Sequence, residues 1–468
     1  MAKAEQFIQM HMLEQLNSLT QFIEHLLFFN IFGVPFVILW LGAVSVFFTI
    51  RLKFINIFGV KHAFDILRGK FNGKQSKDEI TPFKALMSSM AATIGTGSIV
   101  GVAVAVSKGG PGAVFWMMVF GFFGMALKCA EVFLGHRYRK VNADGTITGG
   151  PFIYLKDGLA EMGYVRLGKF LALAFLVLCL LGLFGMSGFQ ANQVVTLLSN
   201  GQDGFTPLKI IYSLALTAFC AYIIIGGVQR VSSFASIFVP LKVGLYVGAV
   251  LLIILSHPVQ LVHGIKLIFT EAFNFSSGIT AFFAMVAIGA RRALMACEAG
   301  LGTSPIVNAS SNVKYSQRQG ILNIFDPFVT TWFVCVATSL VLIMSGLYTQ
   351  TSLNPAILVR NAFASYHEIF GYIMVVSVII FGVATVFAVS YYFMQAGKAL
   401  KIPNRILYLF FFTFLFLSGI LQFDLVIAFT DILLVLMAIV NTFGLYFLSG
   451  KIAREFKDYF ANHKNDKE

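Results

Sequence analysis

The sequence is poor in charged residues. Only 12% of its 468 residues are Asp, Glu, Lys or Arg and 58% are hydrophobic, whereas soluble globular proteins have about 25% charged residues. This composition excludes a soluble domain and predicts an all-α polytopic membrane protein. The net charge of +13 does not indicate a nucleic-acid partner, because the Lys and Arg residues are concentrated in particular loops.

Features of enzymes and metal sites are also missing. We find no phosphate-binding loop, no metal-ligand cluster and no nucleophile–base pair, so neither a cofactor nor a metal centre is predicted beyond a coupling ion. Histidine is absent from the middle of every predicted span, which weakens an imidazole proton relay and leaves a carboxylate relay through Glu131 or Glu298 open. The five cysteines lie within or beside apolar spans without metal-ligand spacing: Cys129, Cys179, Cys220, Cys297 and Cys335.

Apolar runs long enough to cross a bilayer fill most of the chain. The hydropathy pattern predicts about 11 transmembrane helices. They cover residues 30–50, 83–107, 112–134, 170–198, 209–227, 234–255, 280–296, 321–344, 369–395, 406–422 and 426–448. Residues 1–29 are predicted as an amphipathic leader instead of a signal peptide, because acidic residues occur there without a small-residue cleavage site.

The basic residues predict the orientation. Most of the 34 Lys and Arg residues fall on one side if the loop 51–82 is cytoplasmic. The positive-inside rule then places the N-terminus outside and the tail, residues 450–468, in the cytoplasm. We expect the protein in the cell (cytoplasmic or inner) membrane.

The spans divide into two matched sets. Behind one extra helix, residues 30–50, lie five spans in residues 83–255 and five in residues 279–449. Each set opens with a glycine-interrupted span: MAATIGTGSIVG, from Met90 to Gly101, and VAIGARRALMACEAGLG, around Gly289. Corresponding interrupted spans indicate an inverted-repeat transporter with its site near the midplane. Coincidence is the alternative, because glycine is common in membrane helices.

The first interruption has the chemistry of an anion site. A half-helix that starts at Gly97 and Ser98 would offer free amides and a partial positive charge to a carboxylate, with hydroxyls from Thr96 and Ser98 beside them. The alternative is a helix-packing seam of small residues. In the second interruption, Arg292 and Glu298 either line a cavity or pair with each other.

Three other spans carry isolated polar residues. Lys128 and Glu131 have the i,i+3 spacing of a structural ion pair. Gln190 is predicted to face the helix bundle as a substrate contact or a polar lock. The Thr385 hydroxyl, with exposed helix carbonyls, would suit a hard cation, although hydrogen bonding to the preceding turn is commoner.

Three blocks resemble the alanine/glycine:cation symporters, also called sodium:alanine symporters. They are GTGSIVGVAVAVSKGGPGAVFWMMVFGFFGMALKCAE (Gly95 to Glu131), TGGPFIYLKDGL (Thr148 to Leu159) and EAGLGTSPI (Glu298 to Ile306). The resemblance covers nearly the whole chain and implies a LeuT-like 5+5 inverted repeat preceded by one extra helix. It further implies uptake of alanine or glycine, in some members D-alanine, driven by sodium or protons.

The resemblance also implies roles for single residues. Substrate contacts would come from Thr96, Gly97, Ser98, Gln190 and Gly289. A sodium ion would lie at Thr385, near the carbonyls of Ala91 and Ile94.

This chain departs from the family pattern at several of these positions. Ser98 stands where the family usually has asparagine, and Ala384 where it usually has serine. The second change removes a cation ligand, so sodium and proton both stay open as the coupling ion. Thr330 stands at a usual aspartate position, with Asp326 nearby but out of register.

We therefore predict a symporter that imports a small neutral amino acid with sodium or a proton by alternating access. A polytopic membrane enzyme and a channel are the alternatives. Membrane lipid surrounds the chain, no nucleic-acid partner is expected, and the oligomeric state stays open.

Overall fold

The protein is almost entirely helical. A computed structural model describes residues 29–31, 34–71, 79–142, 146–202, 205–225, 228–276, 278–464 and 466. The predicted leader, residues 1–29, lies outside the described residues except for Phe29. Within the described part of the chain, the strands are limited to two short antiparallel pairs: β1 (Asn30–Ile31) with β2 (Val34–Pro35), and β3 (Lys140–Val141) with β4 (Ile147–Thr148).

Long apolar helices form the body of the molecule. Among the described residues, eight helical segments are long and apolar enough to cross a bilayer. They are α7 (Gly112–Arg137), α9 (Val165–Leu198), α10 (Pro207–Ile224), α11 (Val228–Ser256), α13 (Ile279–Cys297), the run from α15 to α17 (Ser316–Ser345), α19 (Glu368–Ala399) and α21 (Phe423–Asp458) with its extension η4 (Tyr459–His463). Two apolar helices are shorter, α2 (Phe36–Arg51) and α20 (Asn404–Ile420).

The predicted interruption of the second span is confirmed. Helix α5 (Pro82–Thr93) begins at Pro82, where the Thr81 hydroxyl accepts a hydrogen bond from the Lys84 amide at 3.3 Å. It ends in a single 3₁₀ turn, η1 (Thr96–Ser98), and the chain continues as α6 (Val100–Gly109). The two halves are bent by 65°, and together they count as a ninth candidate span among the described residues.

Shorter elements connect the spans. They are α3 (Ile55–Phe58), α4 (Val60–Leu67), α8 (Pro151–Glu161), α12 (Pro258–Ala272), α14 (Ser304–Asn308), η3 (Leu347–Thr349) and α18 (Pro355–Ala364). The run from α15 to α17 consists of α15 (Ser316–Leu322), α16 (Phe325–Pro327), the π-helical η2 (Phe328–Cys335) and α17 (Val336–Ser345). Each predicted span overlaps one of the apolar helices. The first, residues 30–50, begins with β1 and β2 and becomes helical only at Phe36. The number of spans that cross a bilayer stays a prediction.

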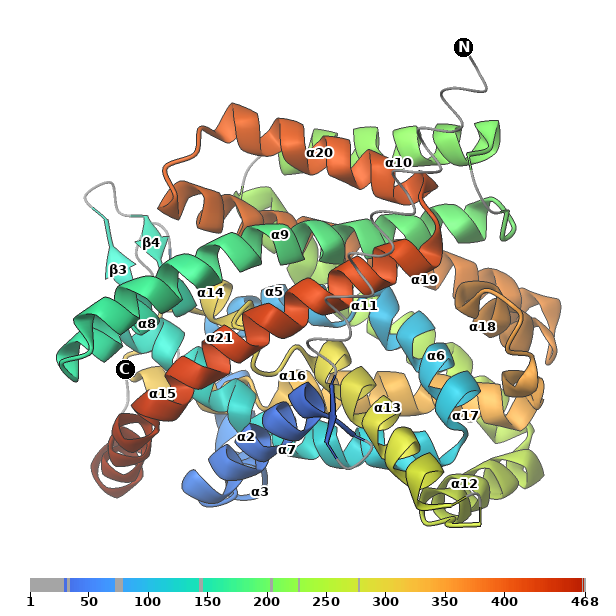
Figure 1. Ribbon diagram of the computed structural model, residues 1–468, viewed down its shortest axis with the longest axis horizontal. Coiled ribbons are helices and arrows are strands. Elements are labelled where there is room, and N and C mark those ends of the chain that lie inside the picture. The colour runs from blue at the N-terminus through green and yellow to red at the C-terminus, as the bar shows by residue number, and fades with distance from the viewer. Residues whose placement is uncertain are drawn as a thin grey trace.

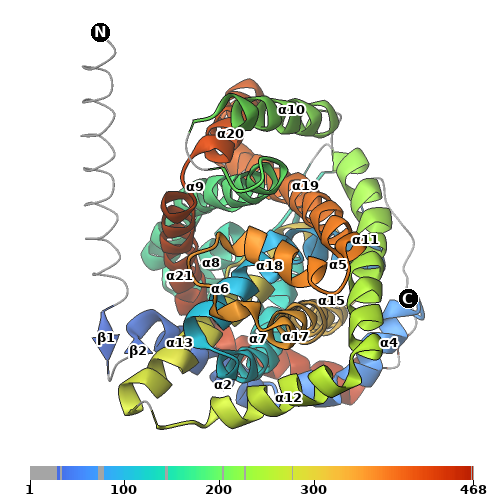
Figure 2. The same cartoon turned by 90° about the vertical axis from the view of Figure 1, so that its right-hand side faces the viewer.

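The broken helix lies inside a shell of long helices. Helix α9 packs against α8, α19, α20 and α21, and Figure 1 shows α9 and α21 crossing the molecule side by side. In the view along these helices, α5 and α6 lie in the interior, with α11 and α21 on opposite sides of the molecule (Figure 2). The break in α5–α6 is therefore surrounded by protein, the setting in which irregular backbone is tolerated at membrane depth.

The second predicted interruption is displaced in the chain. Helix α13 runs without a break through Gly289 to Cys297, so the prediction of a break near Gly289 is wrong. The backbone breaks nine residues later, where Glu298, Gly300 and Gly302 have φ values of 51°, 84° and 80°. A Cβ on Gly289 would lie 2.5 Å from the Ala113 carbonyl of α7, so this glycine permits close helix packing.

Candidate functional site

Gly95 allows the broken helix to approach two neighbouring helices. A Cβ built on it would lie 2.7 Å from the Thr385 hydroxyl of α19 and 2.9 Å from the Gln190 side-chain nitrogen of α9. Its φ of −106° is accessible to any residue. Glycine is therefore needed here for space and not for backbone conformation.

Gln190 holds the turn that follows the break. Its Oε1 accepts two hydrogen bonds from Thr96, one from the backbone amide at 2.8 Å and one from the hydroxyl at 2.7 Å. The structure thus brings together two residues predicted as substrate contacts. In this conformation they bond to each other, which is the polar lock considered as the alternative for Gln190.

The amides of the break are not equally available. The Ser98 amide donates to the Gly95 carbonyl at 3.2 Å, and the Ser98 hydroxyl donates to the Thr93 carbonyl at 3.4 Å. The expectation of a free Ser98 amide is therefore wrong. The Gly97 amide has no acceptor among the described residues, and a Cβ on Gly97 would meet no atom within 4 Å.

A cavity of about 60 Å³ lies beside Gly97. It is lined by Ala92, Thr93, Gly95 and Gly97 of the broken span, Met186, Phe189 and Gln190 of α9, Arg292, Met295, Ala296 and Glu298 at the end of α13, and Ile427, Thr430, Asp431 and Leu434 of α21. One water needs about 10–15 Å³ by the same measure, so the cavity has room for a few waters or one small solute. Neither Ser98 nor Gly289 is among its lining residues.

Arg292 and Asp431 line this cavity, and Arg291 also pairs with Asp431. Asp431 Oδ2 lies 2.6 Å from a guanidinium nitrogen of Arg291 and 3.6 Å from one of Arg292. Arg292 therefore pairs across the cavity to α21, and the predicted alternative of an Arg292–Glu298 pair is wrong. Glu298 instead accepts a hydrogen bond from the Thr303 hydroxyl at 2.6 Å.

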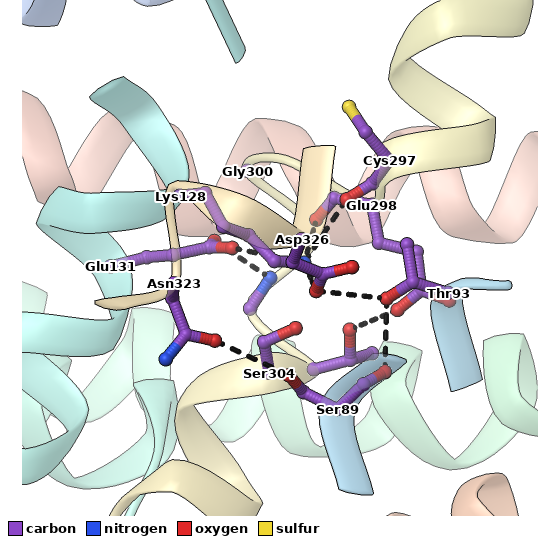
Figure 3. Close-up of polar contacts among 12 residues, drawn as sticks. Ser89, Thr93, Lys128, Glu131, Cys297, Glu298, Gly300, Ser304, Asn323 and Asp326 are labelled. Carbon is purple, nitrogen blue, oxygen red and sulfur yellow. Dashed lines mark hydrogen bonds and ion pairs between the residues drawn. The ribbon is translucent and has the colours of Figure 1, made fainter. Parts of the chain in front are cut away.

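The predicted pair of Lys128 and Glu131 is present as part of a larger buried cluster. Lys128 Nζ lies 3.9 Å from Glu131 Oε1 and 3.4 Å from Asp326 Oδ2, and all three side chains are fully buried. The same Nζ donates to the carbonyls of Cys297 at 3.1 Å and Glu298 at 3.4 Å (Figure 3). A cation at the C-terminus of α13 is favoured by the helix dipole.

The carboxylates of this cluster extend it to neighbouring elements. Glu131 Oε2 accepts from the Gly302 amide at 3.1 Å and from the Asn441 side chain of α21 at 3.2 Å. Asp326 Oδ2 accepts from the Thr93 hydroxyl of α5 at 3.1 Å. We call Thr93, Lys128, Glu131 and Asp326 the Lys128 cluster; it joins the ends of both broken segments to α7 and α16 (Figure 3).

The residues assigned to a sodium position also lie together. Thr385 of α19 donates its hydroxyl hydrogen to the Ala91 carbonyl at 2.9 Å. Beside it, Nζ of Lys242 from α11 lies 2.5 Å from the Ile94 carbonyl and 3.5 Å from the Ala91 carbonyl. An ammonium group therefore reaches the two carbonyls that the resemblance assigned to a metal ion.

Sequence reasoning missed Lys242 and Asp431, and it named Asp326 only as a residue out of register with the family pattern. Each is an isolated ionisable residue in an apolar stretch, which alone is a sign of a functional or paired position. That sign was available for Lys242 and Asp431 as well. Their partners, by contrast, lie more than a hundred residues away in the chain.

We expect the Gly95→Ala variant to be less stable and less active. The added methyl would push against Thr385 and Gln190, and overpacking of this kind costs about 1–3 kcal/mol. The measurement is thermal unfolding in detergent together with alanine uptake in liposomes. Gly97→Ala is the matched control for stability, since its methyl meets open space; an unchanged midpoint and uptake rate for Gly95→Ala would contradict the packing argument.

Comparisons with known proteins show the family of the chain. The model of the "Sodium:alanine symporter family" matches residues 14–468. The sodium/alanine symporter AgcS of Methanococcus maripaludis is 34% identical over 439 residues, 92% of this chain and 96% of that protein. The probable sodium/glutamine symporter GlnT of Bacillus subtilis is 29% identical over 464 residues, 96% of this chain and 93% of that protein.

A solved structure supports the fold. The crystal structure of MhsT in complex with L-phenylalanine aligns with a TM-score of 0.53 and 13% identity, and the alignment covers 83% of this chain and 99% of that one. This likeness supports a LeuT-like arrangement of the helices. Since the family model spans nearly the whole sequence and a relative above 30% identity covers it almost end to end, the chain belongs to the sodium:alanine symporter family.

Proposed function

We propose that this multi-pass membrane protein imports a small neutral amino acid, alanine or glycine first, into the cytoplasm. Membership of its family makes the chain a secondary active symporter of amino acids, and not a membrane enzyme. The substrate is the part that we infer. One relative is named for alanine and another for glutamine, so the family name alone does not fix it.

The cavity beside the open Gly97 amide is the observation that carries this proposal. The amide has no acceptor among the described residues and stands at the start of the half-helix that α6 continues. A carboxylate is the natural ligand for such an amide, because the helix N-terminus carries a partial positive charge. The two hydrogen bonds that Thr96 donates to Gln190 would then position this turn. The Ser98 hydroxyl would support it through its hydrogen bond to the Thr93 carbonyl.

The substrate ammonium would face the end of α13. Met295 and Ala296 line the cavity within the last turn of that helix, where carbonyl groups lack intrahelical partners. The partial negative charge of a helix C-terminus favours a cation there. This assignment replaces Gly289, which packs against α7 away from the cavity lining.

The size of the cavity supports a short side chain. About 60 Å³ accommodates a molecule comparable to a few waters. Phe189 and Leu434 among the lining residues would close around the side chain of the substrate. Alanine and glycine fit this description better than large aromatic amino acids do.

The inverted repeat and the orientation belong to the same proposal. Eleven spans would comprise the extra helix of residues 30–50 and two repeats of five spans each, residues 83–255 and 279–449. The loop 51–82 and the tail 450–468 would both lie in the cytoplasm. The broken segments at Gly95–Gly97 and Glu298–Gly302 begin or end near the same cavity, which supports that pairing. A sodium ion or a proton would accompany the substrate.

Counterflow of labelled alanine in proteoliposomes tests the function. We expect saturable exchange that unlabelled glycine inhibits and unlabelled phenylalanine does not. Empty liposomes are the control. The absence of exchange with every small neutral amino acid would overturn the proposal, as would a conductance that does not saturate with substrate.

A further inference from the structure

Lys242 is a fully buried lysine in the middle of an apolar helix. Its side chain has 0% exposure, and it lies on α11 two residues after Pro240. Its ammonium reaches the end of α5, with Nζ 2.5 Å from the Ile94 carbonyl and 3.5 Å from the Ala91 carbonyl. A charged side chain inside a membrane-spanning helix costs free energy, so such a residue is expected to have a function.

The place that this ammonium fills has the ligands of a cation site. Ala91 and Ile94 lie at the C-terminal end of α5, where unpaired carbonyls and the helix dipole attract positive charge. From α19, Thr385 donates to the Ala91 carbonyl at 2.9 Å and the Phe381 ring centre lies 4.9 Å from Nζ. Carbonyl and hydroxyl oxygens suit a hard metal cation, and the ring attracts an ammonium.

Lys242 has no acidic partner within 4 Å among the described residues. The elements packed against α11 present neutral groups to Nζ: the carbonyls from α5 and the Phe381 ring from α19. Tyr246, one turn along α11, is bonded to Thr338 of α17 at 2.7 Å, and η2 contributes no charged residue. Charged side chains on α10 and α12 form no ion pair with it; they are Lys209, His263, Lys266 and Glu271.

The contrast with Lys128 separates two kinds of buried lysine. Lys128 lies within 4 Å of two carboxylates, which hold its charge in place. Lys242 is held only by carbonyl dipoles and a ring, which are the partners that a bound cation would have in its place.

We propose that the Lys242 ammonium takes the place of a metal ion at this site, so that a proton and not sodium drives transport. The proposal rests on the proposed function, since it concerns which ion drives it. A sodium ion at the Ile94 carbonyl would collide with Nζ. Ala384, next to Thr385, supplies no further hydroxyl ligand.

The ammonium ties α11 to the end of α5 without a bound metal ion. Because sodium and the proton are the two coupling ions of the proposed function, a site closed to sodium leaves the proton as the driving ion.

Uptake in proteoliposomes with controlled ion gradients tests the proposal. In sodium-free choline buffer, an inward pH difference of one unit should drive up to about tenfold accumulation of alanine, the ratio that one proton per substrate sustains. Replacing choline by sodium at equal pH should add no drive. Accumulation that requires a sodium gradient and ignores the pH gradient would overturn the proposal.

The variant Lys242→Ala removes the ammonium from the carbonyls and should therefore let sodium stimulate exchange, whereas sodium should not affect the wild type. Lys209→Ala, which removes another buried lysine from the start of α10, is the matched control and should stay insensitive to sodium. A Lys242→Ala protein that exchanges alanine and stays insensitive to sodium would also overturn the inference. Counterflow of the wild type is measured first: if no exchange occurs, the proposed function fails, whereas exchange with a sodium drive overturns only the role of Lys242.

Discussion

Replacing Gly97 with leucine should reduce alanine uptake at least about 100-fold while the protein stays folded in the membrane. A Cβ at this position meets no atom within 4 Å, so the side chain would extend into the cavity of about 60 Å³ instead of into packed protein. Forcing extra methylene groups into occupied space costs about 1–3 kcal/mol, and 1.4 kcal/mol is a factor of ten. The initial rate of uptake, normalised to protein in the liposomes, is the measurement.

The chain offers a matched control for this substitution. Gly248 lies in the membrane helix α11, and a Cβ there also meets no atom within 4 Å. It is not among the cavity-lining residues, so Gly248→Leu should transport at the wild-type rate. A well-folded Gly97→Leu protein with wild-type uptake would exclude the carboxylate position proposed above.

Replacing Lys128 with methionine should destabilise the protein by about 3–5 kcal/mol. The substitution leaves the buried carboxylates of Glu131 and Asp326 without their cation, and it removes the donor to the carbonyls of Cys297 and Glu298. Thermal unfolding in detergent and the yield of monodisperse protein measure the effect. We expect a variant that is poorly recovered from membranes.

A second substitution identifies the partner that matters most. Asp326 is the nearest carboxylate to Lys128 Nζ, so Asp326→Asn should recover part of the loss in the Lys128→Met background. A double-mutant cycle measures their coupling free energy. Additive effects of the two substitutions, with no recovery in the double variant, would show that the pair is not the source of the stability.

The first broken helix was predictable because its cause is local. Three glycines with interspersed hydroxyls, from Gly95 to Gly101, weaken a helix wherever they occur. The second break was predicted at the wrong glycine, because a glycine in a membrane helix can either permit close helix packing or adopt a backbone conformation that breaks the helix. Gly289 admits the backbone of α7, whereas Gly300 and Gly302 adopt positive φ. The sequence alone does not show which backbone will approach.

The sequence indicated which residues lie at the site better than it indicated which side chains they bond to. Thr96 and Gln190 were both expected at the substrate, and the structure brings them together as a bonded pair. Asp326, by contrast, was judged out of register with the family pattern. It lies on a single short turn, α16, ahead of the π-helical η2. The wider helical spacing of such a segment shifts which residues face inward, a change that counting along a regular helix misses.

The Lys128 cluster also determines which half of the broken span opens locally first. Hydrogen bonds to charged groups contribute about 1.5–3 kcal/mol, and neutral ones about 0.5–1.5 kcal/mol. On one side of the broken span, Thr93 is anchored to the Asp326 carboxylate; on the other, Thr96 is held by the neutral amide of Gln190. Amide hydrogen exchange should therefore be faster on the Gln190 side, so that α6 loosens while the end of α5 remains fastened.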